Sequence, residues 1–442
     1  MDSRALALHV ALRLRQTGFQ AFFAGGCVRD LLLDREPADY DVATSALPSR
    51  VLASFPDAIA VGAHFGVVLL VRGSAKVEIA TFRSDLGYSD GRHPDAVRFS
   101  ASGEEDVQRR DFTINGMLMD PESGRILDFV GGQADLKAGI IRSIGDPVRR
   151  FEEDKLRMLR AVRFAARFSC TIEENTLAAI RANPHAVLQV SAERIREELT
   201  KLLTEGSARR GFELLDDSGL LEATLPEVSR MKGVAQPPEY HPEGDVWIHT
   251  RLMLAELPPG ISPRLAWGVL LHDAGKPPTF RSAEETGDRI RFDGHVEIGA
   301  QLSAEICNRL KFSNDDTEQI VALVANHLRF KDALQMRQST LKRFVRLPRF
   351  EEHLELHRLD CLSSHRRLEA FDFVRKFLQE TPPGLVRPQR LVSGDDLISL
   401  GVPPGPAYGP ILRAVEDAQL EGLISSRDEA LEFLRQRTRQ IQ

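Results

Sequence analysis

The sequence predicts an α+β fold, in which a small mixed or antiparallel sheet near the N-terminus is followed by an all-α remainder. Strand-like apolar patterns are found among helical ones in the first part of the chain, at Val67–Val71, Val77–Phe82 and Arg125–Phe129. Beyond Leu136 the apolar spacing is helical almost throughout. Strands confined to one end of a largely helical chain indicate a sheet-containing head and separate helical regions.

The length of 442 residues suggests two to four domains. We place the sheet-containing head at residues 1–136 and a helical neck and body at residues 137–235. A Pro-rich break at residues 236–242 is interpreted as a linker. The third predicted domain spans residues 236–370, and a helical tail spans residues 371–442.

A pair of glycines follows the first predicted strand, Phe22–Ala24, and precedes a helical pattern that starts near Val28. Glycine lets backbone N–H groups approach a bound anion, and a helix N-terminus adds unpaired donors and a positive dipole end. We therefore expect Gly25 and Gly26 to hold a triphosphate, with Arg29 as a charged partner. Two adjacent glycines alone are weak evidence.

Two carboxylates follow the glycines. Asp39 and Asp41 alternate along a predicted strand, so both point to one face, as expected for residues that hold Mg²⁺ in phosphoryl transfer. Glu78 lies on the polar face of another strand and is a candidate third ligand. An isolated Asp-x-Asp is otherwise typical of a surface loop or a cap.

A basic helix is expected to open at Glu153. Within it, Asp154 and Arg157 lie three residues apart and therefore on one face, where an acceptor and a fork of donors can mimic the edge of a base. Arg157, Arg160 and Arg167 are expected to be available to phosphates. The alternative is an exposed ion pair within the helix.

Several segments resemble, in order, a known family. They are GGCVRD, DYD, EIATFR, RRDFTING, EEDKLRMLRAVRFAARF and residues 193–199. These motifs resemble those of class II nucleotidyltransferases, the family of CCA-adding tRNA nucleotidyltransferases and bacterial poly(A) polymerases. The resemblance implies a nucleotidyltransferase head that uses Mg²⁺, with CTP and ATP as substrates and the 3′ end of tRNA as acceptor.

The resemblance also implies roles for single residues. Asp39 and Asp41 would be the catalytic carboxylates, and Asp154 and Arg157 would select the base. Further residues are expected around the incoming nucleotide, namely Gly25, Gly26, Arg29, Asp30, Arg110, Asp111, Asn115 and Arg160.

The segment Arg83–Val97 contains Gly87, Gly91 and Pro94 among charged residues, which predicts a mobile loop. In the resembling family a flexible loop at this place accompanies addition of the terminal A. The resemblance thus implies an enzyme that can add A. A surface hairpin without a role is the alternative.

A second set of candidate ligands follows the Pro-rich break: His249, His272, Asp273, His295, His327 and Asp360. A single helical histidine is usually structural, but this combination is expected for a divalent metal that activates water in phosphoester hydrolysis. The order resembles an HD phosphohydrolase domain, with His295 and His327 where two-metal variants have extra ligands. The identity of this metal and the substrate are left open.

The C-terminal half contains further candidates for RNA contacts. Arg337–Arg349 holds five cations and no acid, so it is either a stripe for an RNA backbone or a solvated helix face. Residues 393–410 resemble the tail of longer bacterial family members. The resemblance implies that neck, body and tail hold the acceptor and TΨC arms of tRNA by shape and phosphate contacts.

The formal charge of −6 does not indicate a nucleic-acid binder by itself. No long apolar run or signal-peptide pattern is present, and the four cysteines have no CxxC spacing. These features predict a cytoplasmic protein with no membrane partner. They do not predict an oligomeric state.

The sequence therefore predicts a CCA-adding member of this family that also carries an HD domain. An A-adding enzyme that works beside a CC-adding partner, or a poly(A) polymerase, would share the same motifs. A tRNA-binding HD phosphohydrolase with an inert head is a weaker alternative, because Asp39 and Asp41 are both present.

Overall fold

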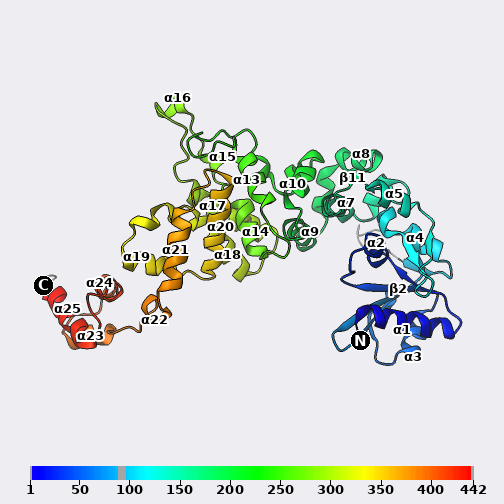
Figure 1. The fold of residues 1–442 in the computed structure, drawn as a ribbon, viewed down its shortest axis with the longest axis horizontal. Helices are drawn as coiled ribbons and strands as arrows, with labels where there is room; N and C mark the ends of the chain where they lie inside the picture. The colour runs from blue at the N-terminus through cyan, green and yellow to red at the C-terminus, as the bar shows by residue number, and fades with distance from the viewer. Residues whose placement is uncertain (1, 88–95, 440–442) are drawn as a thin grey trace. The chain divides into compact units, whose positions relative to one another are not determined.

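The computed structural model describes residues 2–87 and 96–439, which form two compact units (Figure 1). The first unit consists mainly of residues 1–229, and the second mainly of residues 230–442. The division lies close to the predicted boundary at residue 235. The four predicted domains remain predictions at a finer level than these two units.

The first unit is built on a seven-stranded sheet with the order β3-β4-β5-β2-β1-β8-β9. The strands are β1 (Ala21–Ala24), β2 (Tyr40–Thr44), β3 (Ile59–Gly62), β4 (Val67–Arg72), β5 (Ala75–Thr81), β8 (Met117–Met119) and β9 (Ile126–Asp128). All neighbours pair antiparallel except β2 and β5, which run parallel. The prediction of a small mixed sheet in the head is confirmed.

Helix α1 (Ser3–Gln16) packs against this sheet. Its Leu6, Val10 and Leu14 recur every four residues and are fully buried. They share an apolar core with Val42 of β2 and Ile79 of β5. Because side chains alternate along a strand, the residues next to Val42 and Ile79 point to the opposite face, which is therefore open to polar chemistry.

Short elements complete the sheet-containing part of the first unit. They are α2 (Gly26–Leu32), α3 (Pro48–Ser54), η1 (Ala63–Phe65), the paired strands β6 (Arg83–Leu86) and β7 (Ala96–Phe99), α4 (Gly103–Gln108), η2 (Thr113–Asn115), α5 (Gly132–Ala138) and β10 (Ile140–Ile141). Residues 88–95 of the predicted loop lie outside the described residues. The described flanks, β6 and β7, pair antiparallel.

The rest of the first unit is helical except for β11 (Thr171–Ile172), which pairs with β10. Its helices are α6 (Pro147–Glu153), α7 (Leu156–Arg167), α8 (Glu174–Ala182), η3 (Pro184–Gln189), α9 (Ala192–Thr204), α10 (Ala208–Asp217), α11 (Leu220–Thr224) and α12 (Pro226–Ser229). The predicted helical character beyond Leu136 is confirmed.

The second unit is wholly helical over its described residues. Its elements are α13 (Val246–Ala255), α14 (Pro263–Leu271), α15 (Lys276–Thr279), α16 (Ala283–Thr286), α17 (His295–Arg309), α18 (Asn314–Asn326), η4 (His327–Gln335), α19 (Gln338–Phe344), α20 (Phe350–Ser363), α21 (Glu369–Glu380), α22 (Pro383–Val386), α23 (Gly394–Ser399), α24 (Tyr408–Leu420) and α25 (Arg427–Arg439). Among the described residues, no helix is long and apolar enough to cross a membrane.

Two apolar clusters organise the C-terminal part of the second unit. Phe371 and Val374 of α21 pack with Phe330 and Phe344, so α21 belongs with the helices that precede it. A separate cluster between residues 392 and 434 joins α23, α24 and α25. The tail therefore has a small core of its own that begins after α21.

The cations of Arg337–Arg349 are largely paired within the second unit. Arg343 and Arg346 form ion pairs with Glu416 of α24, at 3.0 and 2.7 Å. Lys342 is buried and donates to a backbone carbonyl of the same helix, and Arg349 pairs with Asp315. The interpretation of this segment as a free stripe for RNA is wrong, because acids of α24 and α18 neutralise it.

A buried ion pair joins the two central helices of the neck. The Arg163 Nε of α7 lies 2.6 Å from a Glu198 carboxylate oxygen of α9, and both side chains are almost fully buried. Removing one partner of such a pair leaves a buried charge without compensation. The pair therefore makes α7 and α9 depend on each other.

We predict that Glu198→Ala lowers the free energy of unfolding of the first unit by about 3–5 kcal/mol, because Arg163 keeps its charge in a dry site. Glu197→Ala, at the exposed neighbouring position, is the matched control and is expected to cost little. Differential scanning calorimetry of both variants is the measurement. Equal losses of stability in the two variants would contradict the prediction.

Candidate active site

The first unit contains a cavity of 430 Å³ in which most of the predicted nucleotide-binding residues meet. The predicted residues that line it are Gly25, Gly26, Arg29, Asp41, Arg110, Asp111, Asn115, Asp154, Arg157 and Arg160. Two lining residues were missed, Arg109 and Phe164. Arg109 stands beside a predicted residue in RRDFTING, and Phe164 lies on the same helix as Arg160, so both had a weak local signal.

The glycine pair stands at the start of α2, as the sequence predicts. Gly25 has a φ of +72°, a conformation that L-residues with side chains seldom adopt. A Cβ on Gly25 would also lie 2.9 Å from the Arg110 guanidinium. A glycine is therefore required here both by the turn from β1 into α2 and by the close approach of a cation.

The carboxylates of the site gather along β2 and β5. Asp41 is the register partner of Glu78 across the parallel pair, and Asp39 directly precedes β2 with its carboxylate 3.0 Å from Lys76 Nζ. Burial raises the pKa of Asp41 to about 6, and the nearby charges of Glu78 and Asp39 act in the same direction, against Arg110. Carboxylates that repel one another in this way fit a hard divalent cation, which would relieve the repulsion.

A chain of polar contacts forms one wall of the cavity. Arg29 pairs with Asp30 at 2.8 Å and donates to the Asn115 side-chain oxygen at 2.6 Å. Asn115 donates in turn to Asp111, which accepts two N–H groups of Arg160 at 2.9 and 2.7 Å. The wall thus links α2, the η2 region and α7 through side chains that hold one another in place.

Asp111 stays ionised within this wall. Burial raises its pKa, but the Arg160 guanidinium and the hydrogen bonds from Asn115 and the Phe112 N–H outweigh burial and lower the pKa to about 2. The negative charge of Asp111 therefore persists at neutral pH and keeps Arg160 oriented.

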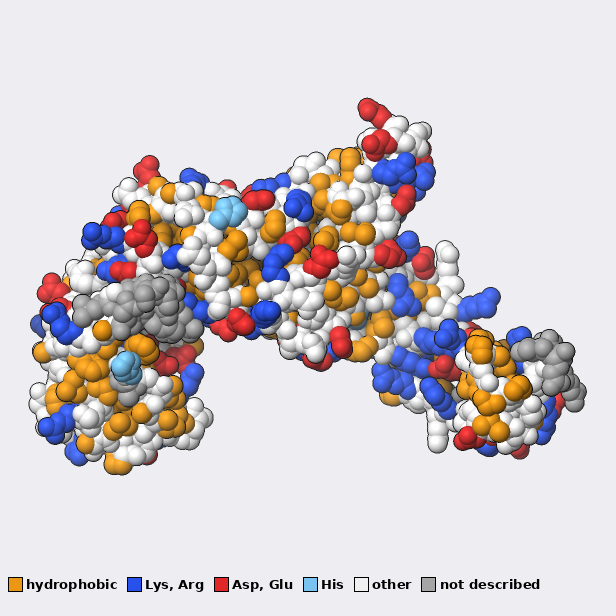
Figure 2. All heavy atoms as spheres, turned by 180° about the vertical axis from the view of Figure 1, so that it is seen from behind, with side chains coloured by type: hydrophobic (Ala, Val, Ile, Leu, Met, Phe, Trp, Pro, Cys, Tyr) orange, Lys and Arg blue, Asp and Glu red, His pale blue; other side chains and the backbone are white. Residues whose placement is uncertain are grey.

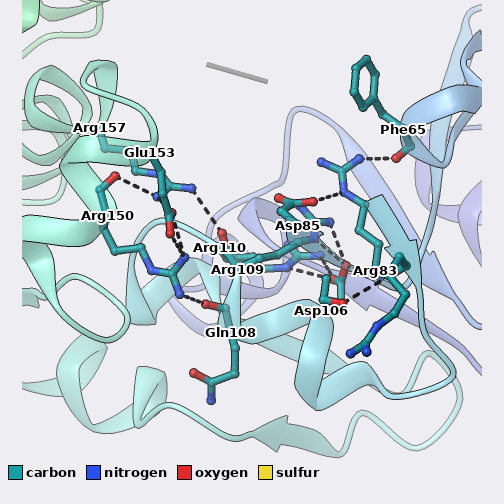
Figure 3. A network of polar contacts seen from close by, with 12 residues as sticks. Phe65, Arg83, Asp85, Asp106, Gln108, Arg109, Arg110, Arg150, Glu153 and Arg157 are labelled. Carbon is teal, nitrogen blue, oxygen red and sulfur yellow. Dashed lines mark hydrogen bonds and ion pairs between the residues drawn. The ribbon is translucent and has the colours of Figure 1, made fainter. Parts of the chain in front are cut away.

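A second network holds further arginines that line the cavity, namely Arg109, Arg110 and Arg157 (Figure 3). The fully buried carboxylate of Asp106 accepts from Arg109 at 2.7 Å and from Arg110 at 3.0 Å. Arg157 pairs with Glu153 at 2.6 Å and donates to the Arg109 carbonyl oxygen at 3.3 Å. Arg157 therefore contacts the backbone of the residue that directly precedes Arg110.

The same network reaches the described end of the predicted loop. The Arg83 backbone N–H lies 3.4 Å from Asp106, and the Arg83 side chain pairs with Asp85 at 2.8 Å (Figure 3). Arg83 also donates to the carbonyl oxygen of Phe65. The first strand of the hairpin is therefore anchored to the carboxylate that holds Arg109 and Arg110.

The predicted helix with Asp154 and Arg157 on one face is wrong in its geometry. Helix α6 ends at Glu153 and α7 begins at Leu156, with Asp154 extended between them at φ −145° and ψ 104°. Two contacts hold Asp154 in this conformation: its carboxylate accepts the nearby Leu156 N–H at 3.0 Å and pairs at 2.8 Å with Arg194 of α9. Both side chains nevertheless line the cavity.

The basic residues of α7 are less available than predicted. Arg157 is almost buried, and Arg160 and Arg167 are partly exposed but paired with Asp111 and Glu205. Any phosphate that binds there must share these cations with carboxylates. Neighbouring carboxylates therefore neutralise part of the positive charge predicted for this helix.

A second candidate site lies in the second unit, where the six predicted ligands come together. His249, His272 and Asp360 present ligand atoms within 4.8 Å of one another, and so do Asp273, His295 and His327. The His249 Nε2 lies 3.2 Å from Asp360, and the His272 Nε2 lies 3.2 Å from Asp273. Residues from five elements or their ends thus form one cluster.

The neutral state of His327 suits a metal, whereas Asp360 and Glu243 raise the pKa of His249 to about 9 against the effect of burial. Burial and His272 lower the pKa of His327 to about 4, so this imidazole is neutral at pH 7. The His295 Nε2 is buried and has no hydrogen-bond partner among the described residues. Neutral imidazoles and carboxylates are the donors that a divalent transition metal prefers.

The Pro-rich segment is more than the linker that was predicted. His241 and Glu243 form a third group of potential ligands with His249, and Gln236 is buried and accepts from Lys276 Nζ at 2.6 Å. Sequence analysis missed His241, Glu243 and Lys276. Their positions could have indicated a role, because His241 and Glu243 lie within eight residues before His249 and Lys276 lies three residues after Asp273.

Three family models match the chain. The "Poly A polymerase head domain" matches residues 21–142, the "Probable RNA and SrmB- binding site of polymerase A" matches residues 170–232, and the "HD domain" matches residues 245–348. The chain therefore contains a segment similar to the poly(A) polymerase head, followed by a segment similar to an RNA-binding region and one similar to an HD domain.

Over the matched segments the chain is similar to CCA-adding enzymes, as the resemblance of its motifs predicts. The CCA-adding enzyme of Lactobacillus helveticus is 44% identical over 230 residues, 52% of this chain and 57% of the relative. That of Geobacillus sp. is 45% identical over 214 residues, 48% and 53% of the two chains. The chain thus spans about half the length of the curated relatives it matches.

A solved structure matches the whole chain. The crystal structure of the Bacillus stearothermophilus CCA-adding enzyme in complex with CTP is 28% identical, with a TM-score of 0.70. The match covers 100% of this chain and 99% of the other. The similarity in fold therefore extends beyond the segments matched by the curated relatives.

Proposed function

We propose that the chain is a CCA-adding tRNA nucleotidyltransferase, which adds or repairs the 3′-terminal CCA of tRNA from CTP and ATP without a nucleic-acid template. The observation that carries the proposal is the cavity of the first unit, where Asp41 lies with Asp154 and Arg157 among guanidinium groups. The relatives carry this name, and the structure from Bacillus stearothermophilus is a complex with CTP. An A-adding enzyme or a poly(A) polymerase would use the same residues.

In the proposed reaction the 3′-hydroxyl of tRNA attacks the α-phosphate of the nucleotide, and pyrophosphate leaves. Asp39, Asp41 and Glu78 would hold Mg²⁺, which activates the hydroxyl and stabilises the leaving group when it is bound. Arg29 and Arg110 supply positive charge beside Gly25 and Gly26. Asn115 would orient the nucleotide from the wall that it shares with Asp30, Asp111 and Arg160.

Asp154 and Arg157 are proposed to read the base. Cytosine and adenine both present an amino donor beside a ring-nitrogen acceptor, whereas uracil and guanine present a carbonyl at the amino position. Asp154 can accept from the amino group while Arg157 donates to the ring nitrogen. Arg194 and Glu153 hold these two side chains in place, so the protein itself can serve as the template.

The acceptor is proposed to be tRNA, bound along its acceptor and TΨC arms. Residues 170–232 match an RNA-binding model, and the C-terminal tail contains a cavity of 510 Å³ lined in part by Arg390, Arg413 and Arg427. Figure 2 shows Lys and Arg side chains gathered beside the tail. We propose the cytoplasm as the compartment, which the four free, buried cysteines support.

We predict that Asp41→Asn lowers nucleotide incorporation by about 100-fold or more, because metal stabilisation of the transition state is worth several kcal/mol. The substrates are tRNAs that lack A, CA or CCA, incubated with labelled CTP and ATP, and the products are sequenced. The wild type is expected to restore CCA on all three. Asp34→Asn, at an exposed position, is the control.

Each other result has a clear meaning. Full activity of Asp41→Asn with unchanged tRNA binding would refute the catalytic assignment. Extension of only the tRNA that lacks A would identify an A-adding enzyme, and long A tails would identify a poly(A) polymerase.

We predict that Asp154→Ala and Arg157→Ala reduce selection of CTP and ATP over UTP and GTP by about tenfold or more, which corresponds to about 1.4 kcal/mol for each lost base contact. Binding of the triphosphate is expected to change less. Competition assays with all four nucleotides measure selection, and Arg149→Ala in the exposed surface of α6 is the control. Unchanged selectivity would refute the base-reading role.

A second activity is proposed for the HD cluster, namely metal-dependent hydrolysis of a phosphoester. The close approach of His249, His272, Asp273 and Asp360 supports it, and the identity of the metal is not assigned. When bound, such a metal would activate a water molecule. The buried Lys276, 2.7 Å from Asp273, would hold that carboxylate in orientation.

We predict that hydrolysis of bis(4-nitrophenyl) phosphate is lost on treatment with EDTA, restored by a divalent metal and lost in His272→Ala. Asp41→Asn should leave it unchanged, because Asp41 lies in the other unit. His365→Ala, an exposed histidine, is the control. Hydrolysis that survives in His272→Ala, or that is absent from the wild type with every metal, would refute the activity.

A further inference from the structure

Three of the four histidines in the HD cluster share one arrangement. The Nδ1 atoms of His272, His295 and His327 lie 2.8, 2.8 and 2.7 Å from the backbone carbonyl oxygens of Val269, Phe292 and Val324. A carbonyl oxygen can only accept, so each Nδ1 carries the proton. Each Nε2 is then left with its lone pair, which is the state that a metal requires.

His249 is the exception, because its Nδ1 lies 2.7 Å from Oε1 of Glu243 instead. Its Nε2 lies 3.2 Å from Asp360, on the side of the ligand group. A carbonyl three residues earlier is not free for the ring, since the Val246 carbonyl already accepts the Thr250 hydroxyl at 2.9 Å. The carboxylate thus stands where the other histidines use backbone.

A tight turn places Glu243 beside the His249 ring. Asp245 caps α13 by accepting the Ile248 N–H at 2.7 Å, and His249 lies in the first turn of that helix. Gly244, between Glu243 and the cap, has a φ of +126°, which favours glycine. The turn folds Glu243 back against His249, and His241 Nδ1 lies 2.9 Å from the same carboxylate oxygen.

We propose that Glu243 is a positioning residue of the HD site, which holds the proton of His249 on Nδ1 and so directs Nε2 to the metal. The inference rests on the proposed metal-dependent function of this site. A carboxylate behind a metal-binding imidazole fixes its tautomer and orientation and raises its basicity, and losing such a partner weakens metal binding by about 10–100-fold. The residue that directly follows the Pro-rich segment thereby becomes part of the site.

The test measures metal rather than catalysis. Mn²⁺ binding to the full chain is followed by equilibrium dialysis, and the ions lost in His272→Ala define those held by the HD site. Glu243→Met, which keeps the length of the side chain and removes the acceptor, is expected to weaken their binding about 10–100-fold without changing their number. Glu239→Met, at an exposed acid of the preceding Pro-rich segment, is expected to bind as the wild type does.

Glu243→Asp separates positioning from packing. Aspartate keeps the acceptor but shortens the side chain, whereas methionine keeps the length and loses the acceptor. Positioning predicts weaker binding in Glu243→Met than in Glu243→Asp, and a purely structural role predicts the reverse order. Circular dichroism melts in EDTA, expected to be equal for all variants, exclude loss of the fold.

The remaining outcomes are also decisive. Unchanged affinity in Glu243→Met, or the loss of one ion from the total, would overturn the positioning role, the latter because Glu243 would then be a ligand itself. If the wild type holds no more Mn²⁺ than His272→Ala, the proposed metal function fails and the inference fails with it. Metal binding by the wild type together with unchanged binding in Glu243→Met refutes the inference alone.

Discussion

The ion pair between Asp111 and Arg160 is the interaction on which the nucleotide cavity depends. Asp111 stands at the start of the η2 region and Arg160 lies on α7, so the pair joins the sheet-containing head to the helical neck within the first unit. Asp111 also holds Asn115, which receives a donor from Arg29. One ionised carboxylate therefore orients three further side chains before any ligand enters, and such preorganisation favours binding and catalysis.

Pairing of cations is a recurrent feature of both units. Asp106 pairs with Arg109 and Arg110 in the cavity, and Glu416 of the tail helix α24 pairs with Arg343 and Arg346. A buried or half-buried guanidinium without a partner would be costly, so the acids keep these side chains in place. Phosphates of a nucleotide or an RNA would have to share or displace them, which favours ligands that reach several cations at once.

The HD cluster differs from these paired sites, because several of its buried polar atoms have no hydrogen-bond partner among the described residues. Its ligands come from positions between His249 and Asp360, and packing of α13, α14 and α20 brings them together. Backbone carbonyl oxygens accept from the Nδ1 atoms of three histidines, and the Glu243 carboxylate lies beside the Nδ1 atom of the fourth. Buried imidazoles are expensive to charge, so this cluster keeps some of its ring nitrogens neutral.

Much of this protein could be foreseen from local patterns. The mixed sheet, the glycines at the start of α2 and Asp41 on its strand follow from periodicity and spacing, which are properties of a short stretch of chain, whereas the set of HD ligands was predicted from its resemblance to a known domain. The break at Asp154, the neutralised Arg343 and Arg346, and the approach of Glu243 to His249 could not be foreseen. They depend on tertiary folding, because the partner of a charged or hydrogen-bonding group is set by distance in space and by turn geometry rather than by its position along the chain.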